Sequence, residues 1–261
     1  MREFGAMDLV TLLSAGVAVV SASVAAVLGY WQQRRLRTME QRNLMDQYGA
    51  SLAWAAFDLQ SRLFNILRGH VLDRTPGAGA GFLSSFLSRG TPEEGEYVRR
   101  STVFVLAEYL GWVEMLRRDV QFLDLGRSRV NRDVMVKISE IGSALSQISA
   151  DGNELRLFRT HQRAIGELMI HAGGEPGRRR CLGYVEFCAR LDADEEFREW
   201  FRQPLDDVDR LADDAGPSFA RIEGIQQQLI ALVEVLDPKA VRFPQFRQAF
   251  DRDRHPGLFS S

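Results

Sequence analysis

The sequence predicts an all-α protein, in which an N-terminal transmembrane helix precedes an antiparallel bundle of about five to seven helices. A run of 23 uncharged residues lies near the N-terminus, apolar residues recur at helical spacing through most of the remaining chain, and strand-like alternation is nearly absent. The 261 residues are 45% hydrophobic and 26% charged, with a net charge of -2. This composition is typical of folded globular proteins and excludes disordered, collagen-like and disulfide-rich classes.

The uncharged run extends from Leu9 to Trp31. A helix needs about 20 apolar residues to cross the hydrocarbon core of a bilayer, so the run is long enough to span it. A cleaved signal peptide is the alternative interpretation, because small residues at 23–25 resemble a cleavage site. The run is longer than the apolar core of such a peptide, which favours the transmembrane helix.

Basic residues follow the predicted span directly, namely Arg34, Arg35 and Arg37. Positive charge holds the adjoining end of a span in the cytoplasm, which predicts a single-pass protein of the inner membrane with its N-terminus outside. Tyr30 and Trp31 then lie at the lipid–water interface. The expected domains are a short extracytoplasmic tail (1–8), the transmembrane helix (9–31), a cytoplasmic helical bundle (32–245) and a polar tail (246–261).

Small residues recur every four positions in the span, at Ser14, Ala18, Ala22 and Ala26. Such a stripe lets two helices approach closely, which predicts self-association in the membrane. The alternative is that the stripe arises by chance in an alanine-rich segment.

The remaining elements follow from apolar spacing and from helix start and stop signals. Apolar residues from 44 to 67 continue the first helix, and a glycine-rich stretch at 75–81 predicts a loop. Thr91, Pro92 and Glu94 form a capping-box pattern that opens a nearly all-apolar core helix. Further helices are expected near 128–149, 160–171 and 182–189, after a cap at Asp192, from Pro204 and from Pro217.

Two carboxylates interrupt otherwise apolar helical segments, Asp58 and Glu108. A buried carboxylate must be paired or have a raised pKa. One interpretation is a polar ligand pocket inside the bundle, made by these two residues with one member of a nearby group, Arg159, His161 or Arg163. The alternative is a structural salt bridge that fixes helix register, with Arg62 as the helical partner of Asp58.

The sequence lacks the patterns of common catalytic and metal sites. Its four histidines and two cysteines form none of the close pairs that zinc sites use, and no Gly-x-Ser-x-Gly motif occurs, so we expect no metal, no cofactor and no catalytic residue. The arginines at 178–180 precede Cys181 and could lower the pKa of its thiol, which would make it redox-sensitive. The alternative is a buried, inert cysteine.

Charge is unevenly distributed along the chain, with 14 basic and 10 acidic residues at 97–180 against 5 basic and 14 acidic residues at 181–237. In a membrane-anchored protein, a loop bearing Arg178, Arg179 and Arg180 is suited to contact with anionic lipid headgroups. Aromatic residues are not interleaved with these arginines, so nucleic acid is not an expected partner.

The order of the elements and the segments EYLGWVE, FRTHQRAIGE and CLGYVEF resemble a group of uncharacterised single-span helical proteins of high-GC bacteria. The resemblance covers roughly residues 9–245. It implies an anchored helical architecture and brings no activity, ligand or catalytic residue with it.

These observations predict a non-catalytic helical module, anchored in the membrane, that binds a protein partner or itself as a scaffold, adaptor or regulator. Two alternatives remain open. One is a ligand sensor or enzyme that uses the polar pocket inside the bundle. The other is a membrane-acting effector of a defence or toxin system, whose span oligomerises.

Overall fold

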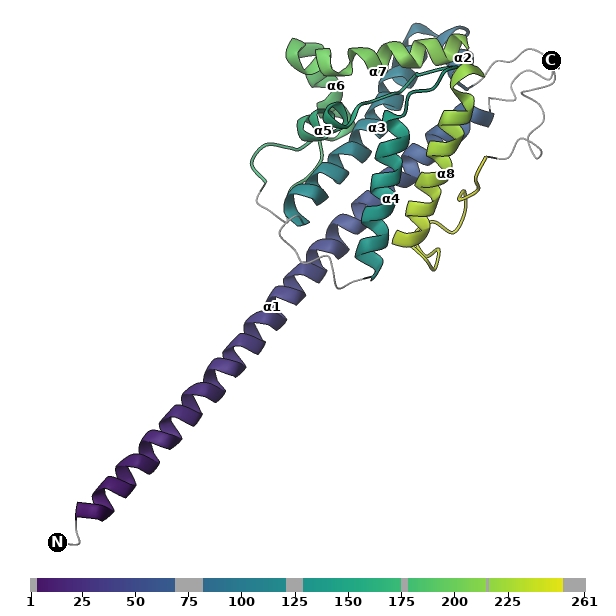
Figure 1. Ribbon diagram of the computed structural model, residues 1–261. Coiled ribbons are helices and arrows are strands. Elements are labelled where there is room, and N and C mark those ends of the chain that lie inside the picture. Colours follow the sequence, from purple (N-terminus) through teal and green to yellow (C-terminus); the bar gives the residue numbers. More distant parts are fainter. Residues whose placement is uncertain (1–3, 69–81, 121–128, 175–177, 215, 251–261) are drawn as a thin grey trace. The chain divides into compact units, whose positions relative to one another are not determined.

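A computed structural model describes residues 4–68, 82–120, 129–174, 178–214 and 216–250 (Figure 1). The side chains of residues 4–15, 36–47, 68, 120 and 129 lie outside that description. The helices are α1 (Phe4–Arg68), α2 (Phe82–Leu87), α3 (Pro92–Val120), α4 (Arg129–Ser146), α5 (Arg159–Leu168), α6 (Tyr184–Ala193), α7 (Glu195–Asp213), the 3₁₀ turn η2 (Gly216–Ser218) and α8 (Phe219–Leu236).

The all-α prediction is confirmed. The described residues form helices packed into a bundle, and their β-structure consists of one isolated bridge between Ile170 and Cys181. Beyond α1 they contain seven α-helices, against the five to seven predicted. The predicted loop at 75–81 lies outside the described residues.

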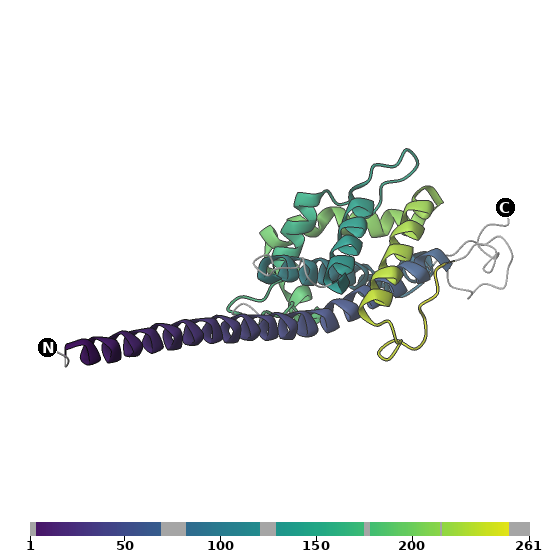
Figure 2. The same cartoon turned by 60° about the horizontal axis from the view of Figure 1, so that its bottom comes forward.

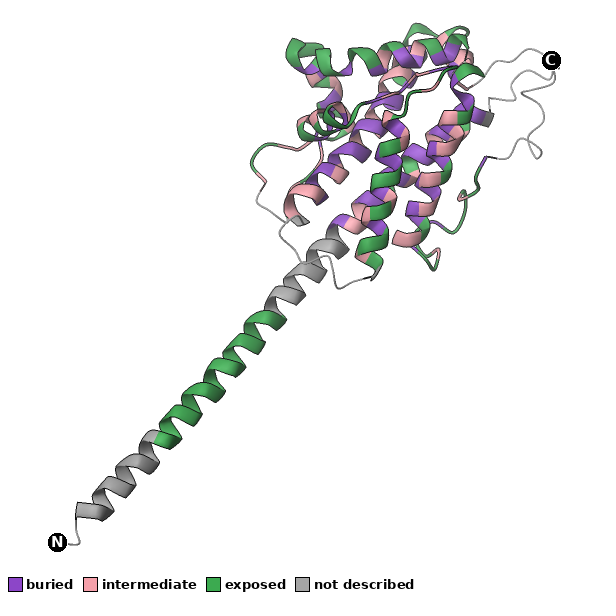
Figure 3. Cartoon of the chain, viewed as in Figure 1, coloured by how far each residue is buried: buried purple, intermediate pink, exposed green. Residues whose placement is uncertain are grey.

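The chain divides into two compact units, Met1–Asp46 and Gln47–Ser261, and α1 contributes residues to both. Residues 16–35 of α1 are all exposed (Figure 3). Within the described residues, no helix combines the length and apolar character that crossing a membrane requires. The predicted span at 9–31 includes residues 9–15, whose side chains are outside the description, and the predicted domain boundaries stay predictions.

The second part of α1 is a core helix of the bundle. Tyr48, Leu52, Leu59 and Leu63 are each at most 3% exposed, and their spacings of four and seven residues place them on one face. Within the bundle, α3 packs closely against α5, and α4 lies beside α8 (Figures 1 and 2). Buried residues line the inner sides of these helices (Figure 3).

The predicted capping box at the start of α3 is confirmed. The Thr91 backbone N–H donates to Glu94 Oε2 at 2.9 Å, and the Glu94 N–H donates to Thr91 Oγ1 at 3.3 Å. Two amide groups that would lack partners at the helix N-terminus are thereby satisfied.

Two predicted helix starts are wrong. Asp194, in an extended conformation, caps α7 by accepting from the Phe197 N–H at 2.9 Å, whereas Asp192 lies in the last turn of α6 and binds Arg100 at 2.8 Å. Pro204 lies inside α7 and does not open a helix. Its ring is buried with Phe201 and Val208, so the apolar face of α7 continues through it.

A polar network inside the bundle holds the C-terminal segment against α1 and α8. The Gln226 amide donates to Gln60 Oε1 at 3.1 Å, and Gln226 Oε1 accepts from the Phe250 N–H at 3.0 Å. Gln60 in turn donates to the Phe246 carbonyl at 2.9 Å. These bonds seat the Phe250 ring in the core, where it contacts Phe219.

Candidate functional site

A partly enclosed cavity of about 260 Å³ lies between α3, α4 and α5. Its apolar lining consists mainly of Leu110, Val113, Leu116, Met135 and Ile138, and its polar lining includes Tyr109, Glu114, Arg117, Arg159, Gln162 and Arg163. Its volume exceeds the roughly 150 Å³ of an engineered cavity that accepts benzene. The cavity is therefore large enough for a small organic molecule.

Two side chains of α5 fix the cavity wall to α4. Arg159 donates to the Ser139 carbonyl at 2.9 Å and to Ser143 Oγ at 2.6 Å. Gln162 donates to the Gly142 carbonyl at 2.9 Å. A Cβ atom at Gly142 would lie 2.5 Å from Arg159 Nη1, so glycine there makes room for the guanidinium.

On the other side of the cavity, α5 packs directly against α3. A Cβ atom at Gly166 would lie 2.5 Å from the Leu110 carbonyl oxygen, so the two helices approach this closely only because residue 166 is glycine. The backbone contact between Gly166 and Leu110 therefore fixes the distance between α3 and α5, the two helices that form this side of the cavity.

Glu114 is a buried carboxylate whose charge is compensated locally. Its side chain is 3% exposed, and Arg117 and Arg118 bind its oxygens at 2.6 and 2.7 Å. Burial would raise the pKa of Glu114, but the hydrogen bonds from both arginines outweigh that effect and hold the pKa below its ordinary value. Glu114 is therefore ionised at neutral pH and accepts hydrogen bonds only.

Tyr109 is fully buried, and its hydroxyl has no hydrogen-bond partner within the described part of the chain. Burial raises the pKa of the Tyr109 phenol, and the nearby Arg159 charge offsets part of this effect. The hydroxyl thus remains a proton donor at neutral pH. A buried hydroxyl without a partner costs about 1–3 kcal/mol, which a suitable acceptor in the cavity would recover.

The structure brings together only some of the predicted pocket residues. Arg159 and Arg163 line the cavity, whereas Asp58, Glu108 and His161 are not part of its lining. The ring of His161 instead contacts α7, where its Nε2 lies 3.2 Å from the Trp200 carbonyl oxygen.

Asp58 and Glu108 lie near one another at a separate place in the bundle. Burial raises the pKa of Glu108, and the charge of Asp58 raises it further, while a hydrogen bond with Trp112 lowers it. Burial also raises the pKa of Asp58. The predicted bond between Asp58 and Arg62 does not form, since Arg62 donates to Ser101 and Thr102 of α3 at 3.2 Å.

Cys181 precedes α6, which begins at Tyr184, so its thiol does not lie in the first turn of a helix, and its redox sensitivity stays a prediction. Burial raises the pKa of its thiol, and the charge of Glu108 adds to the effect. Of the preceding arginines, Arg179 forms an ion pair with Asp119, with 3.0 Å between Nε and Oδ1. Arg178 and Arg180 are exposed. Cys181 is only partly exposed, which together with the raised pKa favours an inert thiol. Contact of the arginine loop with lipid stays a prediction.

The residues predicted at the membrane interface lie in α1. Tyr30, Trp31, Arg34 and Arg35 are exposed, and the Arg37 side chain lies outside the description. In the predicted small-residue stripe, Ala18, Ala22 and Ala26 are exposed, and the Ser14 side chain lies outside the description.

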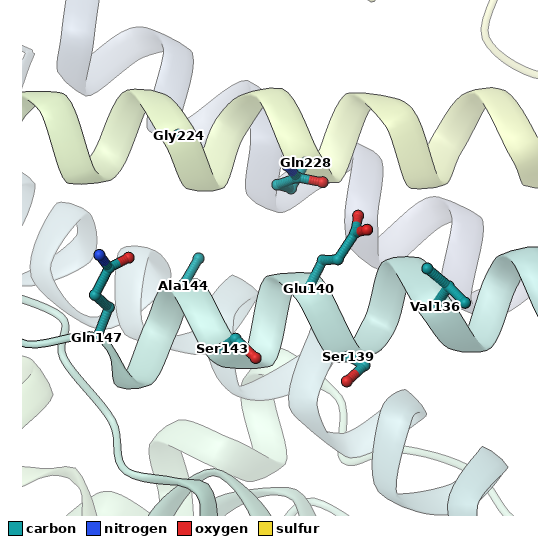
Figure 4. A pocket seen from close by; sticks show the side chains of 8 residues that line it. All are labelled: Val136, Ser139, Glu140, Ser143, Ala144, Gln147, Gly224 and Gln228. Atoms are coloured by element: carbon teal, nitrogen blue, oxygen red, sulfur yellow. The ribbon is translucent and has the colours of Figure 1, made fainter.

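A second, open groove of about 750 Å³ runs between α4 and α8 (Figure 4). Its lining residues are small or polar: Val136, Ser139, Glu140, Ser143, Ala144, Gln147, Gly224 and Gln228. Glu140 extends from α4 towards α8, where Gln228 lies (Figure 4). The groove is open, whereas small-molecule sites enclose most of the surface of their ligand.

Sequence reasoning missed Tyr109 and Glu114. Tyr109 lies within the apolar run of α3, where the sequence pattern predicts an ordinary core residue. Glu114 carried a usable signal, because arginines three and four residues later are spaced to bind its carboxylate on a helix.

In the part of the chain that the structure describes, no three His, Cys, Asp or Glu side chains are grouped so as to hold a metal ion. Comparison with models of protein families, with curated proteins and with solved structures gives no match.

Proposed function

We propose that this protein is a helical module without a reaction of its own, anchored in the inner membrane by residues 9–31, whose cytoplasmic bundle binds a protein partner or a second copy of itself. The proposal rests on the sequence of α1 and on the exposure of its apolar side chains. The bundle supplies a separate compact unit that an anchor would hold at the membrane surface.

The exposed apolar stretch of α1 is the observation that carries the proposal. Six aliphatic side chains between Val17 and Leu28 are each more than half exposed. Burying one such side chain contributes about 1.5–3 kcal/mol, so leaving six of them in water forgoes on the order of 10 kcal/mol. That amount is comparable to the whole stability of a typical domain, which favours a bilayer as the environment of this segment.

The residues that follow the stretch support an orientation. Arg34 and Arg35 are exposed and follow the exposed Tyr30 and Trp31 after two glutamines. Aromatic residues favour the membrane interface and basic residues favour its cytoplasmic side, which supports a cytoplasmic bundle.

Alkaline carbonate washing of membranes from cells that express the full chain tests the anchor. We expect the protein to stay in the membrane pellet, and the double variant Val20→Asp/Val24→Asp to be released, because each charge is costly at the centre of a span. Val20→Leu/Val24→Leu is the matched control and should stay in the pellet. Release of the unaltered chain would contradict the proposal.

A second candidate function is favoured by the cavity between α3, α4 and α5. A pocket with an apolar interior and a few polar groups is typical of a small-molecule site. The bundle would then also act as a ligand sensor.

A further inference from the structure

We propose that the cavity between α3, α4 and α5 binds a small carboxylic acid with an apolar body, whose carboxylate accepts a hydrogen bond from Tyr109 and pairs with Arg159 and Arg163. The site is independent of the membrane anchor, so either proposal can fail without the other.

The charge of the lining selects an anion. Three arginines line the cavity, at 117, 159 and 163, against one carboxylate, Glu114. That carboxylate is already bound by Arg117 and by Arg118 from outside the cavity lining. Arg163 is exposed and makes no hydrogen bond or ion pair within the described residues, so its charge is available to a ligand.

The hydroxyl of Tyr109 supplies a donor that needs an acceptor. It is buried without a partner, and the charge of Arg159 acts on it. The hydroxyl has almost no accessible surface, so neighbouring side chains must move for an entering carboxylate to accept from it while its charge faces the Arg159 guanidinium. Hydrogen bonds to an ionised acceptor contribute more than those between neutral groups.

The apolar lining restricts the remainder of the ligand. Leu110, Val113, Leu116 and Ile138 offer no hydrogen-bonding side chains, so the ligand body must be a hydrocarbon chain or ring. A strongly polar anion such as inorganic phosphate would leave this apolar wall unfilled. The site thus fits a short aliphatic acid or a simple aromatic acid.

Isothermal titration calorimetry on the full chain in lipid nanodiscs, with empty nanodiscs as the blank, tests the site. The probes are hexanoate, benzoate, the neutral hexanamide and acetate. We expect sub-millimolar binding of hexanoate or benzoate, roughly tenfold weaker binding of hexanamide, equivalent to about 1.4 kcal/mol, and no saturable binding of acetate. Preference for hexanoate identifies an aliphatic acid as the ligand, and preference for benzoate an aromatic one.

Two variants test whether the Tyr109 hydroxyl and the Arg163 guanidinium contribute to binding. Tyr109→Phe should weaken binding of the preferred acid about tenfold, because it removes a donor to an ionised acceptor. Its free energy of unfolding without ligand should be no lower than that of the parent, since the lost hydroxyl has no partner. Arg163→Gln should weaken binding about threefold, as expected for an exposed ion pair, whereas the control Arg178→Gln should leave it unchanged.

Three results would overturn the proposal: no saturable binding of either acid at millimolar concentration, equal binding of hexanamide and hexanoate, or unchanged affinity in Tyr109→Phe. Because Tyr109→Phe keeps the ring that fills the core, loss of binding in this variant would not arise from unfolding.

Discussion

The imidazole Nε2 of His161 lies 3.2 Å from the carbonyl oxygen of Trp200, four residues before Pro204. In an uninterrupted helix, this carbonyl would accept from the N–H of residue 204, but proline has none. His161 thus provides, from α5, the donor that α7 lacks. This contact explains how a proline that sequence rules place at a helix start is accommodated inside α7.

Replacing His161 by alanine should lower the free energy of unfolding by about 1 kcal/mol, the typical net worth of a hydrogen bond. The effect should shrink in a Pro204→Ala background, since alanine restores the N–H that the Trp200 carbonyl needs. Denaturant unfolding of the four proteins in this double-mutant cycle measures the coupling. Equal losses in both backgrounds would show that His161 does not compensate for the proline.

Glu108 should destabilise the folded protein at neutral pH. Its pKa is raised by burial and by the Asp58 charge, so the folded state binds the proton more tightly than the unfolded state does. Ionised Glu108 therefore lowers the free energy of unfolding above its raised pKa. This loss becomes smaller as the pH falls towards the ordinary value of 4.5 and larger again as the pH rises.

Glu108→Gln should consequently raise the melting temperature at pH 7 by about 1–3 °C. The gain should disappear below the ordinary pKa, where both forms are neutral. Thermal unfolding across pH, with the exposed Glu199→Gln as control, measures the difference. A destabilised Glu108→Gln at neutral pH would instead indicate that the carboxylate is paired.

Gln226 should be intolerant of apolar replacement despite its buried position. Gln226→Leu leaves the Phe250 backbone N–H and the side-chain oxygen Oε1 of Gln60 without their partner. The expected loss is about 1–3 kcal/mol, and limited proteolysis should then cut the C-terminal segment faster. The exposed neighbour Gln227→Leu should change neither quantity by a comparable amount.

Cys181 should resist thiol reagents in the native protein at neutral pH, because burial raises the pKa of its thiol. Labelling of a Cys188→Ser variant with a maleimide, with and without denaturant, isolates its reactivity. Rapid labelling without denaturant would contradict the inert-thiol interpretation.

The fold class and several helix boundaries could be predicted because they depend on local information. The Thr91 capping box is encoded within four residues, and the buried face of α1 follows from spacing alone. The start of α7 was predicted two residues too early, since Asp192 is followed by Glu195 at capping-box spacing, whereas Asp194 is followed at that spacing by Phe197. Only the end of α6 at Ala193 decides between them.

The candidate site was harder to predict because it depends on contacts between distant helices. Arg159 and Arg163 both line the cavity, since they lie one turn apart on α5, but the cavity is not the predicted pocket around Asp58 and Glu108. Glu108 was selected as their partner because it interrupts an apolar run, but the helical phase of α3 places Glu114 towards them instead. Likewise, only the tertiary structure shows that His161 donates to the Trp200 carbonyl, which lacks a helical donor because residue 204 is proline.

The mass of the intact complex formed by the full chain, released from its native membrane in mild detergent, shows whether the bundle binds a protein partner or a second copy of itself. A module that binds a protein partner or itself should be recovered with the added mass of a second protein or of further copies. Recovery as a single chain, alone or with only a small bound molecule, would contradict the proposed binding.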